Sequence, residues 1–424
     1  MSWKTVRLGD LCTITSSRRC HLADRSEGGI PFYRSKEIIE MHRGYSPADP
    51  DFISRDLYVS IKERFGVPKS GDLLVTSRGT IGIPYLYNKG DEFYFADGNL
   101  TWFKDFSKDL NSRFLYYWIE SEHGRHNITT SAKGTAQKAV SIGFLQDLEV
   151  EFPNLEIQRE IVKRLVAYDQ LIENNRKQIK LLEEAAQRLY KEWFIDLRFS
   201  GHETTPIIDG LPKSWQSKPI GDCINLDIGG GWGVEAESQT HNVKALVIRA
   251  TDIAAVEMGS FVAIPVRWHT VSNLASRRLD AGDIIFEVSG GSKEYGVGRS
   301  LLISSELLSK NDAPFICASF CKRIKPSDGL LSTIISQSLR FALQNDGLRK
   351  YEKRSAGNII NFLWSDFLNN YQVRIPPTHL LNQFVDKVNH YDACRANRAL
   401  AISLAAEARN RLLPKLMDPE SELL

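Results

Sequence analysis

The chain repeats a long part of itself. Residues 134–194 align without a gap with residues 357–417. Many matching positions hold the same residue, among them Gly134/Gly357, Phe144/Phe367, Val150/Val373, Pro153/Pro376, Tyr168/Tyr391, Asp169/Asp392, Asn174/Asn397 and Leu189/Leu412. Solenoid repeats have periods of roughly 20–50 residues, so this longer repeat predicts a duplicated unit made of a domain and a helix. Such a chain presents two similar surfaces, which suits a target in two parts.

Length and composition are compatible with this duplication. The chain has 424 residues, of which 42% are hydrophobic and 25% charged, so we expect two to three domains with their own cores. No apolar stretch approaches the length of about 18 residues that a membrane span needs, and the first residues lack an apolar signal core. The six cysteines form no Cys-x-x-Cys pair, so neither zinc nor disulfides are indicated. We therefore expect a cytoplasmic protein without a membrane partner.

The pattern of each half predicts an α+β domain with many short strands. A Trp, a strand-like run and Gly-Asp open each half, at residues 3–10 and at residues 215–222. Gly71-Asp72 and Gly282-Asp283 each precede an apolar run, which predicts a turn that enters a strand. Further strands are expected at residues 30–33, 85–87, 93–95, 245–248 and 315–320, and helices at residues 110–121 and 330–344.

A long helix should follow each domain. Residues 156–193 contain neither Pro nor Gly, and interface residues recur there at alternating steps of four and three, as in a heptad seam. The second copy follows the same phase, but its seam contains fewer apolar residues, because Arg395, Arg398 and Arg409 occupy seam positions. Pro414 is expected to end the regular part of this helix. The predicted helix-pair interface comprises Ile161, Leu165, Tyr168, Ile172, Asn175, Ile179, Leu182, Leu189, Phe384, Val388, Tyr391, Ile402 and Leu412.

Two such helices in one chain should pair with each other. We predict an antiparallel coiled coil with pseudo-twofold symmetry, in which Asn175 is a polar residue that sets the register. The two globular domains would then face in opposite senses and could contact two sites on opposite strands of one DNA duplex. Off the seam, Leu171, Leu181 and Phe194 are expected to dock a partner helix.

A chain with these features resembles the specificity (S) subunit of a type I restriction-modification system. The resemblance rests on the Leu-Gly-Asp-Leu opening at residues 8–11 with its echo at residues 220–223, and on the Gly-Asp-Leu-Leu-Val-Thr-Ser-Arg-Gly run that starts at Gly71. It also rests on the Gly-Thr-Ala-Gln-Lys run at residues 134–138 and on the duplication itself. Together these features cover almost the whole chain. The second copy departs from the pattern, with Gly-Asn-Ile-Ile-Asn at residues 357–361.

The resemblance implies two tandem target recognition domains, residues 1–152 and 215–375, with a linker at residues 201–214. Spacer helices would cover residues 153–200 and, with the C-terminal tail, residues 376–424. Members of this family bind double-stranded DNA and two modification subunits, which use S-adenosylmethionine to methylate adenine N6. They also join restriction subunits that use ATP and Mg. The specificity subunit binds no cofactor itself and performs no chemistry, so the resemblance implies recognition of an asymmetric bipartite DNA site.

The sequence offers little support for a catalytic or metal site. The glycine-rich residues 229–233 lack a nucleotide-binding fingerprint and predict a flexible loop. His123 and His126 have no partnering cluster, so no metal is expected. Asp283 and Glu287 have the wrong spacing for a nuclease and fit a capping turn and a strand better.

Local basic and amide-rich loops are the candidates for DNA contact, because the net charge of +2 neither demands nor excludes nucleic acid. Arg and Lys neutralise phosphates, and Arg, Lys, Asn and Gln can also bind base edges. The run at residues 349–354 is the strongest candidate, since four cations there surround an aromatic residue. The predicted DNA-contacting residues are Arg34, Ser35, Lys36, Ser77, Arg78, Lys133, Gln137, Lys138, Arg249, Thr251, Lys293, Arg349, Lys350, Lys353 and Arg354.

Three alternatives stay open at this point. The chain could be an enzyme, such as a fused nuclease or methyltransferase, although the motifs for that chemistry are missing. It could be a coiled-coil adaptor that binds only proteins, although the paired basic loops argue against this. A recognition protein of a related phage-defence system could share the same architecture.

Overall fold

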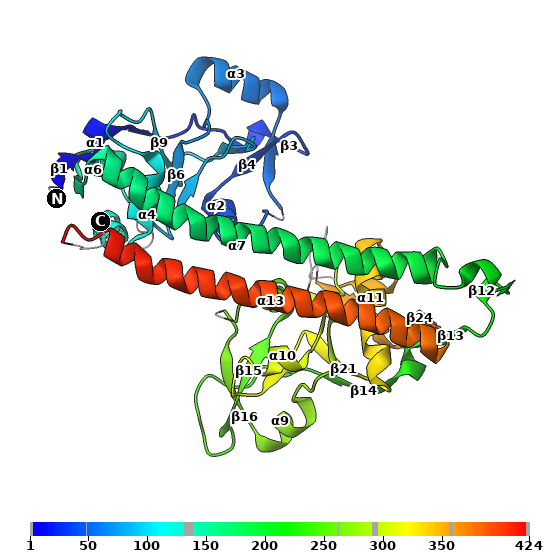
Figure 1. Cartoon of the computed structure of the whole chain (residues 1–424). Helices are drawn as coiled ribbons and strands as arrows, with labels where there is room; N and C mark the ends of the chain where they lie inside the picture. The colour runs from blue at the N-terminus through cyan, green and yellow to red at the C-terminus, as the bar shows by residue number, and fades with distance from the viewer. Residues whose placement is uncertain are drawn as a thin grey trace. The chain divides into compact units, whose positions relative to one another are not determined.

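The computed structural model describes residues 3–47, 49–130, 139–261, 263–290, 296–355 and 359–420. The chain divides into two compact units (Figure 1). Unit 1 contains Met1–Glu173 and Leu404–Leu424, and unit 2 contains Asn174–Ser403. Within the described residues, no helix combines the length and the apolar composition that crossing a membrane would require.

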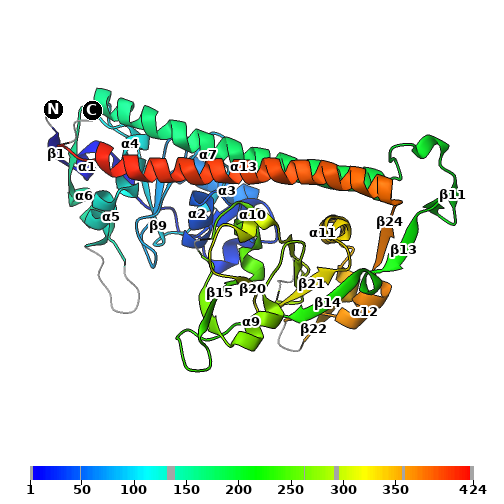
Figure 2. The same ribbon diagram turned by 60° about the horizontal axis from the view of Figure 1, so that its bottom comes forward.

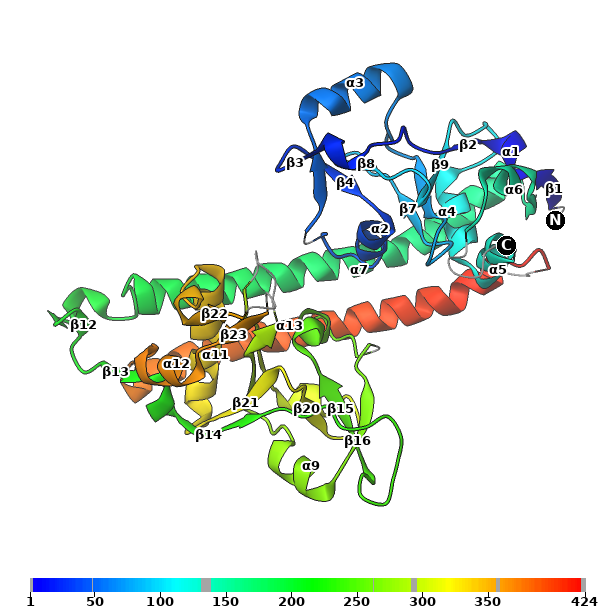
Figure 3. The ribbon, with the colours of Figure 1, turned by 180° about the vertical axis from the view of Figure 1, so that it is seen from behind.

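Unit 1 holds two four-stranded sheets and a strand pair, β1 with β10 (Figure 3). The sheets have the orders β2-β9-β6-β7 and β3-β5-β4-β8, and β4 runs parallel to β8. The strands are β1 Lys4–Arg7, β2 Thr13–Thr15, β3 Arg25–Ser26, β4 Ile30–Tyr33, β5 Asp51–Ile53, β6 Leu73–Thr76, β7 Pro84–Leu86, β8 Tyr94–Phe95, β9 Leu100–Lys104 and β10 Glu149–Phe152. The helices of its globular part are α1 Leu8–Leu11, α2 Ser35–His42, α3 Arg55–Phe65, α4 Ser112–Glu120, α5 Glu122–Thr129 and α6 Ile142–Asp147.

Unit 2 holds sheets of the orders β14-β21-β17-β19, β16-β15-β20 and β18-β23-β22, with β13 paired to β24 (Figure 2). Its strands are β11 Ile207–Ile208, β12 Leu211–Pro212, β13 Gln216–Pro219, β14 Ile224–Gly229, β15 Val243–Ile248, β16 Val266–His269, β17 Ile284–Glu287, β18 Ser289–Gly290, β19 Ser300–Leu302, β20 Phe315–Cys317, β21 Cys321–Pro326, β22 Glu352–Arg354, β23 Ile360–Phe362 and β24 Gln372–Ile375. The helices of its globular part are α8 Ile253–Glu257, α9 Val271–Arg277, α10 Ser305–Leu308, α11 Gly329–Gln344 and α12 Trp364–Asn370.

The main sheets of the two units share one strand topology. Sheet β2-β9-β6-β7 corresponds strand by strand to β14-β21-β17-β19, and all pairs within both sheets are antiparallel. The parallel pair β4/β8 corresponds to the parallel pair β15/β20. The pair β1/β10 corresponds to β13/β24. The repeat in the sequence is therefore matched by a repeat of the chain path.

The Gly-Asp motifs form the expected turns into strands β6 and β17. The Asp72 carboxylate accepts a hydrogen bond from the Lys69 amide at 3.0 Å, and the Asp283 carboxylate accepts one from the Asp280 amide at 2.7 Å. The preceding glycines, Gly71 and Gly282, have φ of +94° and +90°, a conformation that disfavours residues with a Cβ. Each motif thus combines the backbone freedom and the side-chain acceptor that the turn needs.

The ungapped alignment of the repeat is wrong before the last strand of each domain. Val140 donates to the Ser77 carbonyl at 3.0 Å and Phe362 donates to the equivalent Val288 carbonyl at 2.8 Å, so Val140 corresponds to Phe362. The ungapped alignment instead matches Val140 with residue 363. The difference arises because α12 is one residue longer than α6. From β10 and β24 onward the register agrees, since Leu148 and Tyr371 accept equivalent bonds.

The long helices are α7, Leu155–Tyr190, and α13, Thr378–Leu416 (Figure 1). Each begins in one unit and ends in the other. In unit 1, Leu413 and Leu416 at the end of α13 share a hydrophobic core with Ile161 and Leu165 of α7. The prediction that Pro414 ends the regular helix is wrong, because the helix continues to Leu416. A proline so close to the C-terminus removes only one late backbone hydrogen bond, and the buried Leu416 stabilises the last turn.

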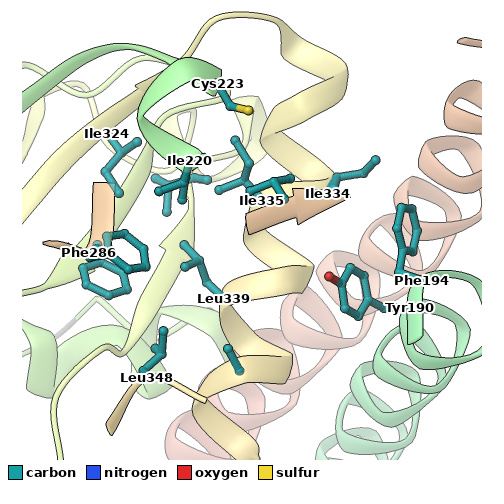
Figure 4. Packing of buried hydrophobic residues seen from close by; sticks show 14 of the residues in the cluster. Tyr190, Phe194, Ile220, Cys223, Phe286, Ile324, Ile334, Ile335, Leu339 and Leu348 are labelled. Carbon is teal, nitrogen blue, oxygen red and sulfur yellow. The ribbon is translucent and has the colours of Figure 1, made fainter. Parts of the chain in front are cut away.

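The end of α7 belongs to the core of unit 2. A π-helical turn, Lys191–Ile195, follows Tyr190 and turns both Trp193 and Phe194 into that core. The Phe194 ring lies 4.8 Å from the Phe384 ring and 4.9 Å from the Tyr190 ring. Figure 4 shows the residues of α11 between Phe286 of the sheet and these aromatic rings. The prediction that Phe194 docks a partner helix is therefore wrong, because the side chain is fully buried in its own chain.

Most predicted interface residues of the two helices are buried. The buried positions are Ile161, Leu165, Ile172, Asn175, Ile179, Phe384 and Val388. The partly buried positions are Tyr168, Leu182, Leu189, Tyr391, Ile402 and Leu412.

Two of the arginines on the α13 seam pair with acids. In unit 1, Arg409 Nη1 lies 2.7 Å from Asp169 Oδ1 of α7. In unit 2, Arg395 Nη2 lies 2.7 Å from Glu183 Oε1 of α7, which also contacts Arg340 of α11 at 3.3 Å. Acids contributed by α7 therefore compensate the charges that make the α13 seam poorer in apolar residues.

Candidate nucleic-acid interface

In each unit one predicted DNA-contacting arginine lies where the parallel strands end. The Ala96 amide donates to the Tyr33 carbonyl at 2.8 Å after β4, and the Ala318 amide donates to the Ile248 carbonyl at 2.9 Å after β15. Arg34 directly follows β4 and Arg249 directly follows β15. The carboxyl end of a parallel strand pair leaves loop residues exposed at one edge, where they can meet a ligand.

The two arginines are held by acids of their own unit. The amides of Arg34 and Arg249 donate to Glu37 at 2.8 Å and to Asp252 at 2.9 Å, which caps the following helical turns. The Arg249 guanidinium makes two further bonds to Asp252, at 2.7 and 2.8 Å, and these bonds raise the pKa of Arg249. Arg34 pairs with Asp51. Both guanidinium groups therefore have a structural partner before any phosphate approaches.

One backbone carbonyl joins the first two predicted clusters of unit 1. The Asn99 carbonyl accepts hydrogen bonds from the Ser35 hydroxyl at 3.2 Å and from the Ser77 amide at 2.9 Å. Lys36, on α2, is exposed, and its amino group lies 3.9 Å from Glu40. Arg78 is exposed, and no acid lies within ion-pair distance of it in the part of the chain that the structure describes. Arg34, Lys36 and Arg78 are thus exposed near one carbonyl although they lie far apart in the sequence, whereas the side chain of Ser77 is buried.

The corresponding surface of unit 2 contains the turn before β21. The Phe320 carbonyl accepts from the Val288 amide at 2.9 Å, as the Asn99 carbonyl accepts from the equivalent Ser77 amide, and it also accepts from the Ser289 amide at 3.3 Å. Thr251 is exposed after β15. Arg323 of β21 is buried and pairs with Asp283 at 2.7 Å.

The basic run at residues 349–354 is divided among several environments. Tyr351 lies in the core of unit 2, so it is not a stacking platform for DNA. Arg349 Nε lies 2.5 Å from Asp346, and the Lys350 amino group lies 4.9 Å from the centroid of the Tyr351 ring. Lys353 and Arg354 are exposed on β22. The exposed basic surface of this run therefore includes Arg349 and Lys350 before β22 as well as Lys353 and Arg354 on it.

Lys133, Gln137, Lys138 and Lys293 lie outside the described residues.

The glycine-rich residues 229–233 are packed and hydrogen-bonded, contrary to the expectation of a flexible loop. The Gly230 amide donates to the Cys321 carbonyl and the Gly231 amide to the Cys317 carbonyl, both at 2.9 Å. A Cβ on Gly230 would lie 2.2 Å from the Ala318 carbonyl oxygen. The glycines therefore allow close backbone contact with the turn beside Phe320.

The acids considered for metal or nuclease chemistry already have partners. Asp283 pairs with Arg323, and Glu287 accepts two bonds from the Arg299 guanidinium at 2.6 and 2.9 Å. The His123 ring bonds the Asn127 amide at 3.1 Å. Across the described ranges, no group of three or more His, Cys, Asp or Glu side chains is arranged to hold a metal ion.

Three polar or aromatic residues of the candidate interface escaped the sequence analysis: Asn99, Phe320 and Asn361. Asn99 and Phe320 each stand directly before a strand, and Phe320 is 62% exposed, which is unusual for phenylalanine. Asn361 alternates with the buried Ile360 and Phe362 on β23. That alternation is visible in the sequence, but it indicates an outward side chain only once the strand itself is known.

The fold defines a two-unit α+β protein with two long helices. Residues 1–184 match the family model described as "Type I restriction modification DNA specificity domain". The MjaIX specificity subunit of a type I restriction enzyme from Methanocaldococcus jannaschii is 25% identical over 430 residues, which cover 98% of this chain and 92% of that protein. The MjaVIII specificity subunit from the same organism is 29% identical over 315 residues, 70% of this chain and 67% of that protein.

A solved structure shows a similar fold. The S subunit of a type I restriction-modification system from M. genitalium aligns with a TM-score of 0.50 at 15% sequence identity, and the alignment covers 99% of this chain and 97% of that one. Residues 1–184 therefore match a type I restriction-modification DNA specificity domain, and nearly the whole chain is similar to a type I restriction enzyme specificity subunit.

Proposed function

We propose that this chain is a DNA-recognition subunit that binds an asymmetric bipartite site on double-stranded DNA. The observation that carries the proposal is the recurrence of one strand topology in two units whose exposed side chains differ at equivalent places. Equal scaffolds bring their loops to equivalent positions on two half-sites, and different side chains bind different bases. The chain itself performs no chemistry.

The proposal includes an antiparallel coiled coil with pseudo-twofold symmetry formed by α7 and α13. In unit 2, α7 residues of rising number contact α13 residues of falling number, since Glu183 pairs with Arg395 and Tyr190 with Phe384. In unit 1, Asp169 pairs with Arg409. The helix pair would then hold the two recognition domains, and hence the half-sites, about one helical turn of DNA apart.

Partner subunits would supply the chemistry. We expect two modification subunits that hold S-adenosylmethionine, and restriction subunits that hold ATP and Mg. Leu181 of α7 and Leu400 and Leu404 of α13 are 62%, 46% and 57% exposed, although they lie on long helices with buried seams. Exposed leucines of this kind support docking of partner helices.

Methylation mapping tests the function. The chain is expressed with its genomically neighbouring modification subunit, and the host DNA is sequenced for N6-methyladenine. We expect one bipartite motif with modified adenines on opposite strands, and no motif when the modification subunit is expressed alone. A stable complex without new methylation would contradict the proposal and favour a protein-binding adaptor.

A further inference from the structure

A polar row crosses the small sheet β18-β23-β22 of unit 2. Asn361 of β23 lies directly opposite Ser289 of β18 and directly opposite Lys353 of β22. Residues directly opposite each other in antiparallel strands project from the same face. Ser289, Asn361 and Lys353 therefore form one continuous row across three strands.

This row faces solvent. Asn361 and Lys353 are exposed, whereas Ile360 and Phe362 on the other face of β23 are buried. The Glu352 carboxylate accepts a hydrogen bond from the Val297 amide at 2.9 Å, which occupies it away from the row. Helix α12 covers the buried face, where the Phe362 and Phe367 rings lie 5.1 Å apart.

The Asn361 amide is oriented by its neighbour. The Ser289 hydroxyl donates to Asn361 Oδ1 at 2.9 Å. The Oδ1 atom keeps one lone pair, and the Nδ2 group keeps both hydrogens for an external partner. An oriented amide with one acceptor and one donor side by side matches the N6 and N7 groups of adenine in the major groove.

An exposed aromatic residue borders the row. The Phe320 carbonyl accepts from the Ser289 amide, so the 62% exposed Phe320 stands beside Ser289. An aromatic side chain there can contact a thymine methyl group, and Lys353 at the other end can bind a guanine edge or a phosphate.

The first unit carries different side chains at the same places. Arg78 forms a bridge with Ala139 where Ser289 pairs with Asn361, and Asn99 stands where Phe320 does. The equivalent backbone bonds show that the scaffold is shared, while the exposed chemistry has changed. Such a difference is what two unlike half-sites require.

We propose that Asn361, held by Ser289 and flanked by Lys353 and Phe320, binds an adenine edge in one half-site and sets the specificity of the second domain. This inference rests on the proposed function. Arg78 occupies the position of Ser289 in the first domain and acts on the other half-site.

The test compares methylated motifs of wild-type chain, Asn361→Ala and Asn361→Asp, each expressed with the modification subunit. Asn361→Ala should lower the preference at one A·T position of one half-site by about ten- to a hundredfold, with the other half-site unchanged. Asn361→Asp should shift that position towards C, whose N4 group donates to a carboxylate. Ser289→Ala should weaken the same position, and Arg78→Ala should alter only the other half-site.

Asn369→Ala is the matched control, because Asn369 is an exposed asparagine on α12, on the opposite side of the sheet. It should leave the motif unchanged. An unchanged motif in Asn361→Ala, or an equal loss at both half-sites from an intact complex, would overturn the inference. A wild-type chain that directs no bipartite methylation would instead contradict the proposed function.

Discussion

Single residues show how the two copies of one scaffold use different chemistry at equivalent sites. In unit 1 the buried Asp72 accepts a hydrogen bond from Trp102 Nε1 at 2.8 Å. In unit 2 the equivalent Asp283 accepts from Arg323 Nε at 2.7 Å. Burial raises the pKa of both carboxyl groups, so even the arginine does not fully offset the loss of water around Asp283.

Replacing Arg323 should therefore be costly. Arg323→Ala leaves Asp283 buried without its partner, and we expect the free energy of unfolding to fall by about 3–5 kcal/mol. Arg323→Trp, which recreates the pair of unit 1, should cost less. Urea unfolding measures both, and Lys325→Ala, at an exposed ion pair with Asp280, should change stability by less than about 1 kcal/mol. Equal effects of Arg323→Ala and Lys325→Ala would refute this account.

His269 should make the stability of the protein depend on pH. Its side chain is 1% exposed, and burial, together with the nearby His241 and Arg277, lowers the pKa of His269. The folded state then binds fewer protons than the unfolded state, in which histidine has a pKa of about 6.5. Neutral, buried His269 therefore adds its full contribution to the free energy of unfolding at a pH above the pKa of the unfolded state. This contribution is lost as the pH falls below that pKa.

We expect His269→Phe to lose less stability than wild type between pH 7.5 and pH 5.5, measured by urea unfolding at both values. His126→Gln, at an exposed histidine on α5, should behave like wild type. A loss in His269→Phe as steep as that of wild type would show that other groups govern this pH range.

At the scale of elements, periodicity predicted local structure well. The expected strand at residues 245–248 is part of β15, and the expected helix at residues 330–344 is α11. The heptad seam likewise identified buried positions such as Ile161 and Ile179. These successes follow from local rules, because burial of one face leaves a regular mark in the sequence.

Features that depend on distant partners could not be predicted in this way. Phe194 is apolar and off the seam, and only the π-helical turn after Tyr190 explains why it is buried. Arg409 is a charged residue at a seam position where an apolar residue is expected, yet its charge is compensated by Asp169 of α7. For the candidate site, charge indicated Arg78 and Lys353, but Asn361 became a candidate only through its cross-strand neighbours.

Two exposed leucines on the long helices are expected to contact the modification subunit. Leu181 and Leu404 occupy the same place in the two copies and are both more than half exposed. Burying a leucine side chain stabilises by about 1.5–3 kcal/mol, so the double substitution Leu181→Ser and Leu404→Ser should weaken binding of the modification subunit by about a hundredfold or more.

The binding is measured by titration with the purified modification subunit, and the melting temperature checks that the fold is intact. Leu22→Ser is the control, since Leu22 is 84% exposed but lies outside both helices. Unchanged affinity of the double variant would exclude these leucines from the partner interface.

In the whole molecule, each long helix begins in one unit and ends in the other, and this determines where residues can be inserted into the helices. Each unit is completed by the end of the helix that follows the other domain, with Leu416 in unit 1 and Trp193 in unit 2. The contacts of one unit therefore stop between Glu173 and Asn174 on α7 and between Ser403 and Leu404 on α13. Residues added at both points lengthen the helices while leaving the contacts within each unit in place.

If the helix pair acts as a ruler, four helical residues inserted at both points should lengthen the gap between the half-sites. Four residues add about 6 Å to a helix, which corresponds to roughly two base pairs at 3.4 Å each. Methylation mapping of the insertion variant measures the gap. Four residues inserted beside Asp209, in the exposed turn between β11 and β12, should leave the gap unchanged, because that turn lies outside both helices. A helix-insertion variant that still directs methylation at the original gap would show that the helices do not set the spacing.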